Sequence, residues 1–141
     1  MAIRTAKAAW NGSLKEGDGT LSLGSGAFEG RYSFSSRFEE GTGTNPEELL
    51  GAAHAGCFSM ALAAGLGRAG FSPKRVETLA KVHLGKTDAG MAITRIDLET
   101  RAEVPGIDDA TFQKHAVETK TGCIVSRALS AVEMTLDAKL V

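Results

Sequence analysis

One long apolar segment constrains the fold of this 141-residue chain more than any other feature. It starts at the sequence NPEE, residues 45–48, where Asn45 can cap a helix and Pro46 suits the first helical position. The two acids that follow are favoured at the N-terminal end of the helix dipole. The segment then runs to Ala69, with Gly70 as the expected stop. Because this helix is apolar nearly all round, we expect it to be buried at the centre of the fold.

Short strands are expected before this helix. Strand-like segments at Ile3–Trp10, Thr20–Leu23 and Arg31–Ser35 are separated by turn-forming residues. The segment Phe38–Asn45 is polar and rich in glycine, so it predicts a loop between the last strand and the helix.

Two further strands are expected after the helix. Small or apolar residues occupy every second position from Val76 to Leu84 and from Ile96 to Val104, which predicts one buried face for each strand. In the second segment the intervening residues up to Glu103 are all charged, as in an antiparallel sheet with one face in water. Lys86–Gly90 supplies the turn formers of a hairpin between the two strands.

The C-terminal third predicts two helices and a strand. Asp108 or Asp109 caps a helix that reaches about Lys120, and a shorter helix follows at about 123–130. Alternation predicts a final strand over 132–140. The order βββ-α-ββ-αα-β indicates an α+β fold with antiparallel sheets and helices on one face, and the length predicts a single domain, 1–141.

Composition excludes several classes of partner. The net charge of -1 provides no basic field, so neither nucleic acid nor an anionic membrane is an expected partner. The first ten residues lack the apolar core of a signal peptide, and Arg68 interrupts the best candidate for a membrane span. We therefore expect a cytoplasmic, reducing location, where the two cysteines are free thiols or a working redox pair.

The two cysteines differ in their surroundings. Cys57 lies in the middle of the apolar helix, where a cysteine is more often a small buried side chain than a reactive one. Cys123 follows Thr121-Gly122 and begins a helix, where backbone N–H groups and the dipole stabilise a thiolate. Both are expected to face a common core, and a disulfide between them requires Cα atoms within about 7 Å. A structural role and a dithiol switch both stay open on these residues alone.

A buried thiolate also needs a nearby cation. The candidates beside the glycine-rich loop are Arg31 and Arg37, and Arg37 leads because it lies at a predicted strand end on a segment free to reach a site. Either arginine is, by its residue type, more often a solvated side chain.

His54 lies one helical turn before Cys57 and permits two other sites. A Cys–His pair is the nucleophile and base of some hydrolases. A metal corner with Cys123 and His115 is the second alternative, although the spacing matches no strong zinc pattern. A histidine in the core is the commoner outcome.

Two motifs resemble a known family. The string GTNPEELLGAAHAGCFSMAL, followed by TGCIVSRAL, is similar to the osmotically inducible protein C (OsmC) branch of the OsmC/Ohr family, and the similarity extends over essentially the whole chain. The resemblance implies an OsmC/Ohr-like α+β fold with a long buried central helix, in an intertwined homodimer. It also implies thiol-dependent peroxidase activity in oxidative or osmotic stress defence, toward organic hydroperoxides and less well toward hydrogen peroxide.

The resemblance assigns roles to four residues. Cys57 corresponds to the peroxidatic thiol and Cys123 to the resolving thiol, which form a disulfide, with Arg37 and Glu47 as polar partners. No metal, flavin or haem is implied. The implied partners are a hydroperoxide substrate, a dithiol reductant such as a lipoylated protein, and a second copy of the chain.

Glu47 raises a geometric question. On one straight helix it lies about 15 Å along the axis from Cys57 and about 80° round it, which excludes direct contact. Arg37 bridges part of this gap, or the helix starts after Pro46, or Glu47 comes from the second subunit of a dimer. Glu48 has the same chemistry and is the runner-up.

An apolar wall beside the thiol would favour an alkyl hydroperoxide. The candidates are Phe58, Met60 and Leu62, joined by Phe34 or Phe38, although simple core packing accounts for most such side chains.

Three other functions fit the same residues. A redox sensor or binding module would use the dithiol once, without turnover. A cysteine hydrolase would use Cys57 and His54 and would not need Cys123. A structural stress protein would need neither thiol.

Overall fold

The computed structural model describes all residues from Met1 to Val141. The chain divides into two compact units, Met1–Leu49 and Leu50–Val141, and each is described by itself. The α+β class is confirmed, with two three-stranded sheets and four helices.

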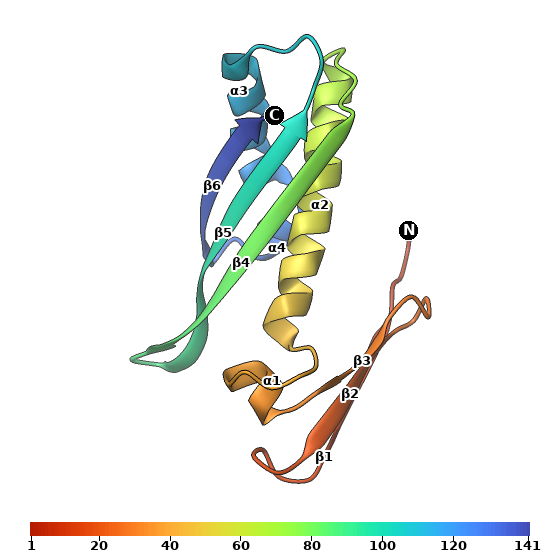
Figure 1. Cartoon of the computed structure of the whole chain (residues 1–141), viewed down its shortest axis with the longest axis vertical. Coiled ribbons are helices and arrows are strands. Elements are labelled where there is room, and N and C mark those ends of the chain that lie inside the picture. Colours follow the sequence, from red (N-terminus) through yellow and green to blue (C-terminus); the bar gives the residue numbers. More distant parts are fainter. The chain divides into compact units, whose positions relative to one another are not determined.

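The first unit is built on an antiparallel sheet of order β1-β2-β3 (Figure 1). Its strands are β1 (Ala6–Asn11), β2 (Asp18–Leu23) and β3 (Glu29–Tyr32). The expected extension of the third strand to Ser35 is wrong, because helix α1 (Phe34–Phe38) begins there.

A capping box explains the start of α1. Ser33 accepts a hydrogen bond from the backbone N–H of Ser36, and the hydroxyl of Ser36 accepts one from the N–H of Ser33. This reciprocal pair satisfies two backbone donors at the helix start. Local serine chemistry therefore overrides the strand propensity of the preceding residues.

The central helix α2 (Pro46–Arg68) has nearly the predicted bounds. The side-chain oxygen of Asn45 accepts a hydrogen bond of 2.7 Å from the Glu48 N–H, which confirms its capping role. At the other end Gly70 has a φ of +92°, a conformation that favours glycine and stops the helix.

The burial predicted for α2 is only partly correct. One stripe of the helix is buried within this chain: Gly51, His54, Phe58, Leu62 and Leu66. The opposite stripe is exposed and consists of small or apolar residues: Ala53, Gly56, Met60, Ala64 and Gly67. Within one chain, therefore, half of an apolar helix remains uncovered.

The expectation that no segment is apolar enough to cross a membrane is also wrong. An 18-residue window of α2 has a mean hydropathy of 1.6, so the helix is long and apolar enough by length and composition. Arg68 does not interrupt this window because it is the last residue of the helix. A central helix of a water-soluble fold passes the same test, so this feature is weak evidence for a membrane.

The second unit contains a mixed sheet of order β4-β5-β6. Strands β4 (Arg75–Thr87) and β5 (Gly90–Glu103) form the predicted antiparallel hairpin. Strand β6 (Glu133–Leu140) pairs with β5 in parallel, so the prediction of purely antiparallel sheets is wrong. A parallel pair needs a crossover, which α3 (Asp109–Gly122) and α4 (Ile124–Ala128) supply.

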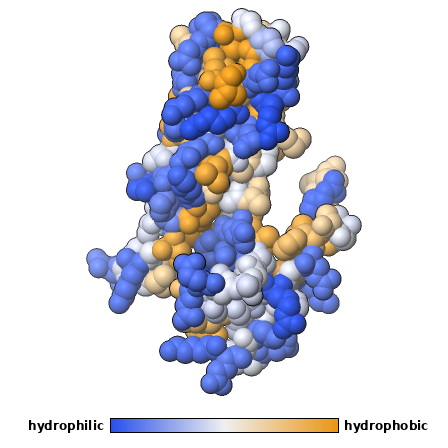
Figure 2. All heavy atoms as spheres, in the orientation of Figure 1, coloured by the Kyte–Doolittle hydropathy of each residue, from blue (hydrophilic) through white to orange (hydrophobic).

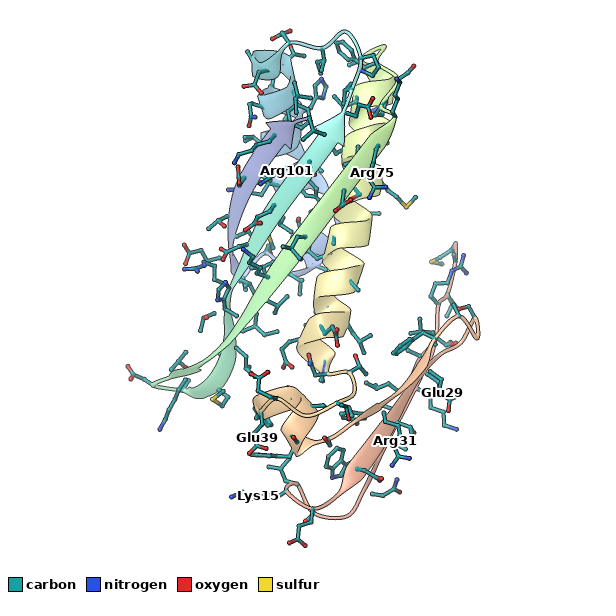
Figure 3. The ribbon with its side chains drawn as sticks, viewed as in Figure 1. Lys15, Glu29, Arg31, Glu39, Arg75 and Arg101 are labelled. Atoms are coloured by element: carbon teal, nitrogen blue, oxygen red, sulfur yellow. The ribbon has the colours of Figure 1, made fainter.

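Helices pack on one face of this second sheet (Figure 1), and the side chains on the other face are mostly hydrophilic (Figure 2). Arg75 and Arg101 extend from β4 and β5 (Figure 3). The buried apolar core lies between sheet and helices and consists of Phe58, Leu62, Leu66, Ile96, Leu98, Ala102, Val104, Phe112, Ala116, Cys123 and Ala138. The alternation predicted for all three strands is confirmed by their burial patterns.

Candidate active site

Cys57 lies on α2 beside the buried stripe. Its thiol is free and its side chain is half-buried, packed against the core of the second unit. A cysteine in this position is neither fully enclosed nor fully solvated.

Cys123 is a member of the same core. It is 2% exposed and forms the N-cap of α4, immediately after the end of α3 at Gly122. Its sulfur accepts a hydrogen bond of 3.3 Å from the Ser126 N–H and lies 3.0 Å from the Ser126 hydroxyl oxygen. The expected common core for the two cysteines is therefore confirmed, while both are free thiols in this state.

His54 is fully buried on the same helix as Cys57. Its Nε2 lies 2.7 Å from the Ser126 hydroxyl oxygen, and its Nδ1 is buried without a hydrogen-bond partner. Burial lowers the pKa of His54 below its usual range, because the charged ring would lose its hydration. The more common outcome for this residue, a histidine in the core, is what the structure shows.

Ser126 was not singled out from the sequence, although it links Cys123 to His54. The sequence does contain a local indication of this contact. Ser126 is three residues after Cys123, and the side chain of an N-cap residue accepts a hydrogen bond from the backbone N–H at that position. His54 and Ser126 are 72 residues apart, so no local pattern predicts their contact.

Arg37 and Glu47 form an ion pair within the first unit. The closest approach joins Arg37 Nη2 and Glu47 Oε1 at 2.8 Å, and Arg37 Nε contacts both carboxylate oxygens at 3.2 and 3.3 Å. Glu47 is 7% exposed, whereas the Arg37 side chain is about one-third exposed. Such a fork between guanidinium and carboxylate fixes the orientation of the arginine.

The surroundings of this pair bear on three expectations. Arg37 lies in the last turn of α1, and not at a strand end. Glu48 accepts a hydrogen bond from Thr44 instead, so Glu47 is the partner of Arg37 in this chain. The helix start after Pro46 is wrong as well, because α2 begins at that residue.

Aromatic side chains surround Arg37. Its guanidinium carbon lies 5.2 Å from the centre of the Phe38 ring, and Phe34 packs against Phe38 with ring centres 5.0 Å apart. These residues help to line a hollow of about 430 Å³, together with Trp10, Leu14 and Tyr32. The sequence indicated only the two phenylalanines, because Trp10 and Tyr32 reach the hollow from separate strands.

The predicted apolar wall on α2 is not one surface. Phe58 and Leu62 are fully buried in the core, whereas Met60 is 76% exposed. Successive residues of an α-helix are rotated by about 100°, so a residue two positions away points to the opposite side.

Arg31 and His115 lie outside these contacts. Arg31 extends from β3 and pairs with Asp18 at 2.5 Å, both side chains being well exposed (Figure 3). His115 lines a hollow of about 440 Å³ that also reaches Cys123, Arg68 and Glu118. No group of three or more histidine, cysteine or acidic side chains is placed to hold a metal ion.

Sequence comparison relates the whole chain to one family. The OsmC-like protein family model matches residues 39–137. The chain belongs to the OsmC-like family. Two relatives called peroxiredoxin OsmC, from Escherichia coli (strain K12) and Shigella flexneri, are each 51% identical over 138 residues, covering 97% of this chain and 96% of the relative.

Solved structures share the fold of this OsmC-like protein. The organic hydroperoxide resistance protein OhrB of Bacillus subtilis superposes with a TM-score of 0.75 at 24% identity, covering 96% of this chain and 98% of that one. An OsmC-like protein of Vibrio cholerae superposes with a TM-score of 0.79 at 16% identity, covering 99% of this chain and 100% of that one. The predicted OsmC/Ohr-like fold is thereby confirmed.

The structure thus groups the predicted site residues into two clusters. One contains Arg37 and Glu47 beside the aromatic hollow, in the first unit. The other contains Cys57 and Cys123 in one core, with His54 linked to Cys123 through Ser126, in the second unit. One cluster thus contains an oriented cation, and the other contains two free thiols.

Proposed function

We propose that this protein is a thiol-dependent peroxidase that reduces organic hydroperoxides. The observation that carries the proposal is the pair of free thiols in one core, with Cys57 partly accessible and Cys123 enclosed. The near-full-length relatives called peroxiredoxin OsmC support the same activity.

The proposed reaction has three steps. The Cys57 thiolate attacks the O–O bond of the hydroperoxide, forming a sulfur–oxygen bond and releasing the alcohol after protonation. Cys123 then attacks the resulting sulfenic acid, so that a disulfide forms and water leaves. A dithiol reductant restores both thiols by exchange and becomes a disulfide itself.

Arg37 and Glu47 have complementary roles in this proposal. The guanidinium supplies a permanent positive charge and several N–H donors for the thiolate and the peroxide oxygens. Glu47 holds that guanidinium in one orientation through both carboxylate oxygens. The aromatic hollow beside Arg37 suits the alkyl or aryl group of an organic hydroperoxide.

A homodimer completes the site in this proposal. No large apolar side chain is fully buried in Met1–Leu49, so the sheet β1-β2-β3 has no core of its own. The exposed stripe of α2 around Met60 is also apolar. A second copy would cover both surfaces and bring the Arg37–Glu47 pair of one subunit to the Cys57 of the other, as an intertwined single domain over 1–141.

The proposed reductant and location follow from the disulfide. The Cys57–Cys123 disulfide must be reduced by thiol–disulfide exchange with an external dithiol, and the dihydrolipoyl group of a lipoylated protein is such a dithiol. A reducing compartment such as the cytoplasm would supply it.

The test follows the two thiols through one turnover. Reduced protein is treated with one equivalent of cumene hydroperoxide, and free thiols and intact mass are measured. We expect wild type to lose both thiols and two hydrogens, and Cys123→Ser to accumulate a trappable sulfenic acid on Cys57. With excess dithiol, wild type should consume peroxide continuously, whereas a redox sensor would stop after one event.

A matched pair of arginine variants tests the cation. Arg37→Met should slow Cys57 oxidation by about 100- to 1,000-fold, the range typical for loss of one oriented hydrogen-bond donor from an active site. Arg31→Met removes an exposed arginine paired with Asp18 and should leave the rate within about twofold of wild type. Unchanged thiols in wild type would contradict the proposed peroxidase activity. Equal rates of Cys57 oxidation in Arg37→Met and Arg31→Met would show that Arg37 has no role in that step.

A further inference from the structure

A chain of buried polar contacts in the second unit includes two residues, Ser126 and His54, that have no role in the reaction above. It runs from the Cys123 sulfur to the Ser126 hydroxyl at 3.0 Å, and from that hydroxyl to His54 Nε2 at 2.7 Å. Cys123 is 2% exposed, Ser126 is 3% exposed and His54 is fully buried. Buried polar groups are costly unless they are paired, so a chain of three in an apolar core calls for an explanation.

The hydrogen-bonding capacity of these groups sets a direction for the chain. The Cys123 S–H donates to the Ser126 oxygen. The serine O–H is then free to donate to His54 Nε2, which accepts it when the ring proton is on Nδ1. His54 Nδ1 has no partner. In that tautomer Nε2 accepts the serine proton, and burial keeps the ring neutral by lowering the pKa of His54.

We propose that Ser126 takes up the proton of the Cys123 thiol during disulfide formation and passes its own hydroxyl proton to His54. This proposal rests on the proposed function, in which Cys123 is the resolving thiol. Ser126 contacts the reacting sulfur and is a catalytic residue, whereas His54 acts through Ser126 and is a positioning residue that holds the proton.

The step balances without an outside reagent. The Cys123 sulfur forms a bond to the Cys57 sulfur while the sulfur–oxygen bond of the sulfenic acid breaks. The departing hydroxide takes up one proton from the solvent and becomes water, and Cys123 loses one proton to Ser126, which passes its own to His54. Because the proton that His54 receives is later released, the net reaction is one thiol and one sulfenic acid giving one disulfide and one water.

Other ionisable groups near Cys123 do not provide this path. Arg68 of α2, and His115 and Glu118 of α3, line the hollow that reaches Cys123. None of these three hydrogen-bonds to Cys123, Ser126 or His54, whereas Ser126 contacts the sulfur with both its N–H and its hydroxyl. The serine–histidine path is therefore the one that the geometry favours.

The test separates the resolving step from the peroxidatic step. The full-length protein is mixed rapidly with cumene hydroperoxide and quenched with an alkylating agent, and intact mass distinguishes thiol, sulfenic acid and disulfide. Ser126→Ala removes the hydroxyl, Ser126→Thr retains one, and His54→Gln retains a polar group without a basic ring nitrogen. Ser59→Ala is the matched control, since Ser59 is a half-buried serine on α2 that bonds to Thr78 instead.

We expect Ser126→Ala to slow conversion of sulfenic acid to disulfide by about 100-fold or more, because general acid–base catalysis contributes about 100- to 10,000-fold in other enzymes. His54→Gln should slow it too, Ser126→Thr should recover part of the rate, and Ser59→Ala should match wild type. Oxidation of Cys57 should stay unchanged in all four. Above about pH 9.5 a thiol ionises unaided, so the defects of Ser126→Ala and His54→Gln should shrink there.

Two results would overturn the proposal. One is a wild-type resolving rate in folded Ser126→Ala and His54→Gln, and the other is a defect of equal size at every pH, which would indicate a purely structural role. If Ser126→Ala does not fold, judged by circular dichroism, His54→Gln alone decides between these outcomes. If wild type itself forms no disulfide, the proposed peroxidase function is contradicted. This outcome differs from the two results above, in which wild type forms the disulfide.

Discussion

At the scale of single residues, the environment of each side chain decides its chemistry. Cys57 and Cys123 are the same residue type in the same core, yet one is half-buried and the other is enclosed and hydrogen-bonded to Ser126. Arg31 and Arg37 differ in the same way, because Asp18 is a solvated partner and Glu47 is a buried one. A buried partner fixes an arginine in place, whereas a solvated one contributes little.

His54 should make stability depend on pH. Its pKa is lowered in the folded protein, so the unfolded chain binds more protons as the pH falls. The free energy of unfolding should therefore be full at about pH 7.5 and decrease below about pH 6.5, the usual histidine pKa. Urea unfolding of wild type and His54→Gln, at about pH 7.5 and again below about pH 6.5, measures this change in the free energy of unfolding.

His83 provides an internal control in that experiment. It is a partly exposed histidine that bonds to Asp97 on the outer face of the sheet. His83→Gln should keep the loss of stability at low pH that His54→Gln abolishes. An identical pH profile for wild type and His54→Gln would contradict the role assigned to burial.

At the scale of elements, the side chain of one acidic residue hydrogen-bonds across all three strands of the second sheet. Asp97 of β5 accepts hydrogen bonds from Thr135 of β6 at 2.7 Å, His83 of β4 at 2.6 Å and Arg95 at 2.8 Å. These contacts, the Thr135 hydrogen bond first, hold the pKa of Asp97 well below its usual range. Asp97 thus links all three strands on the face opposite the core, across an antiparallel and a parallel pair.

Helix α2 contributes two faces with different roles. Leu62 is fully buried and packs in the core, so Leu62→Ala should lower the free energy of unfolding by about 2–5 kcal/mol through lost burial and a cavity. Ala64 lies two residues further on, on the stripe that the proposed homodimer would cover, and Ala64→Ser changes its volume little, so it should cost less than Leu62→Ala. Chemical denaturation measures both, and equal losses would contradict the two-faced description.

At the scale of the whole molecule, the uncovered apolar surfaces are the dominant feature. The first unit has a sheet without a buried apolar core, and α2 exposes Met60 to 76%. Exposed apolar surface of this extent is typical of an interface between subunits. A subunit interface would also account for the apolar character of α2, which is apolar enough to cross a membrane although the outer face of the second sheet is mostly hydrophilic (Figure 2).

Met60→Glu should weaken the proposed homodimer. A charge in the middle of an apolar interface is left without a partner, which costs several kcal/mol when it is buried. Light scattering with size-exclusion chromatography should show a dimer for wild type and a shift toward monomer for Met60→Glu. Val117→Glu, at a 56% exposed site on α3, is the control and should remain dimeric. A monomeric wild type would contradict the dimer.

Much of this protein was determined by its sequence alone. The ends of α2, the hairpin of β4 and β5 and the alternating faces of three strands follow from capping, turn chemistry and periodicity, which act over a few residues. The four proposed site residues, Arg37, Glu47, Cys57 and Cys123, follow from the resemblance of their motifs to a family, and their roles stay a prediction.

Only the tertiary structure decided the rest, because those features join residues far apart in the chain. The parallel pairing of β6, the choice of Glu47 over Glu48 and the contact of His54 with Ser126 depend on how elements pack. Helix α1 is the exception, since its capping box is local, but the strand propensity of Arg31–Ser35 predicts an extended segment there. The exposed stripe of α2 was missed for a related reason: hydrophobicity predicts that a surface is covered, but not which chain covers it.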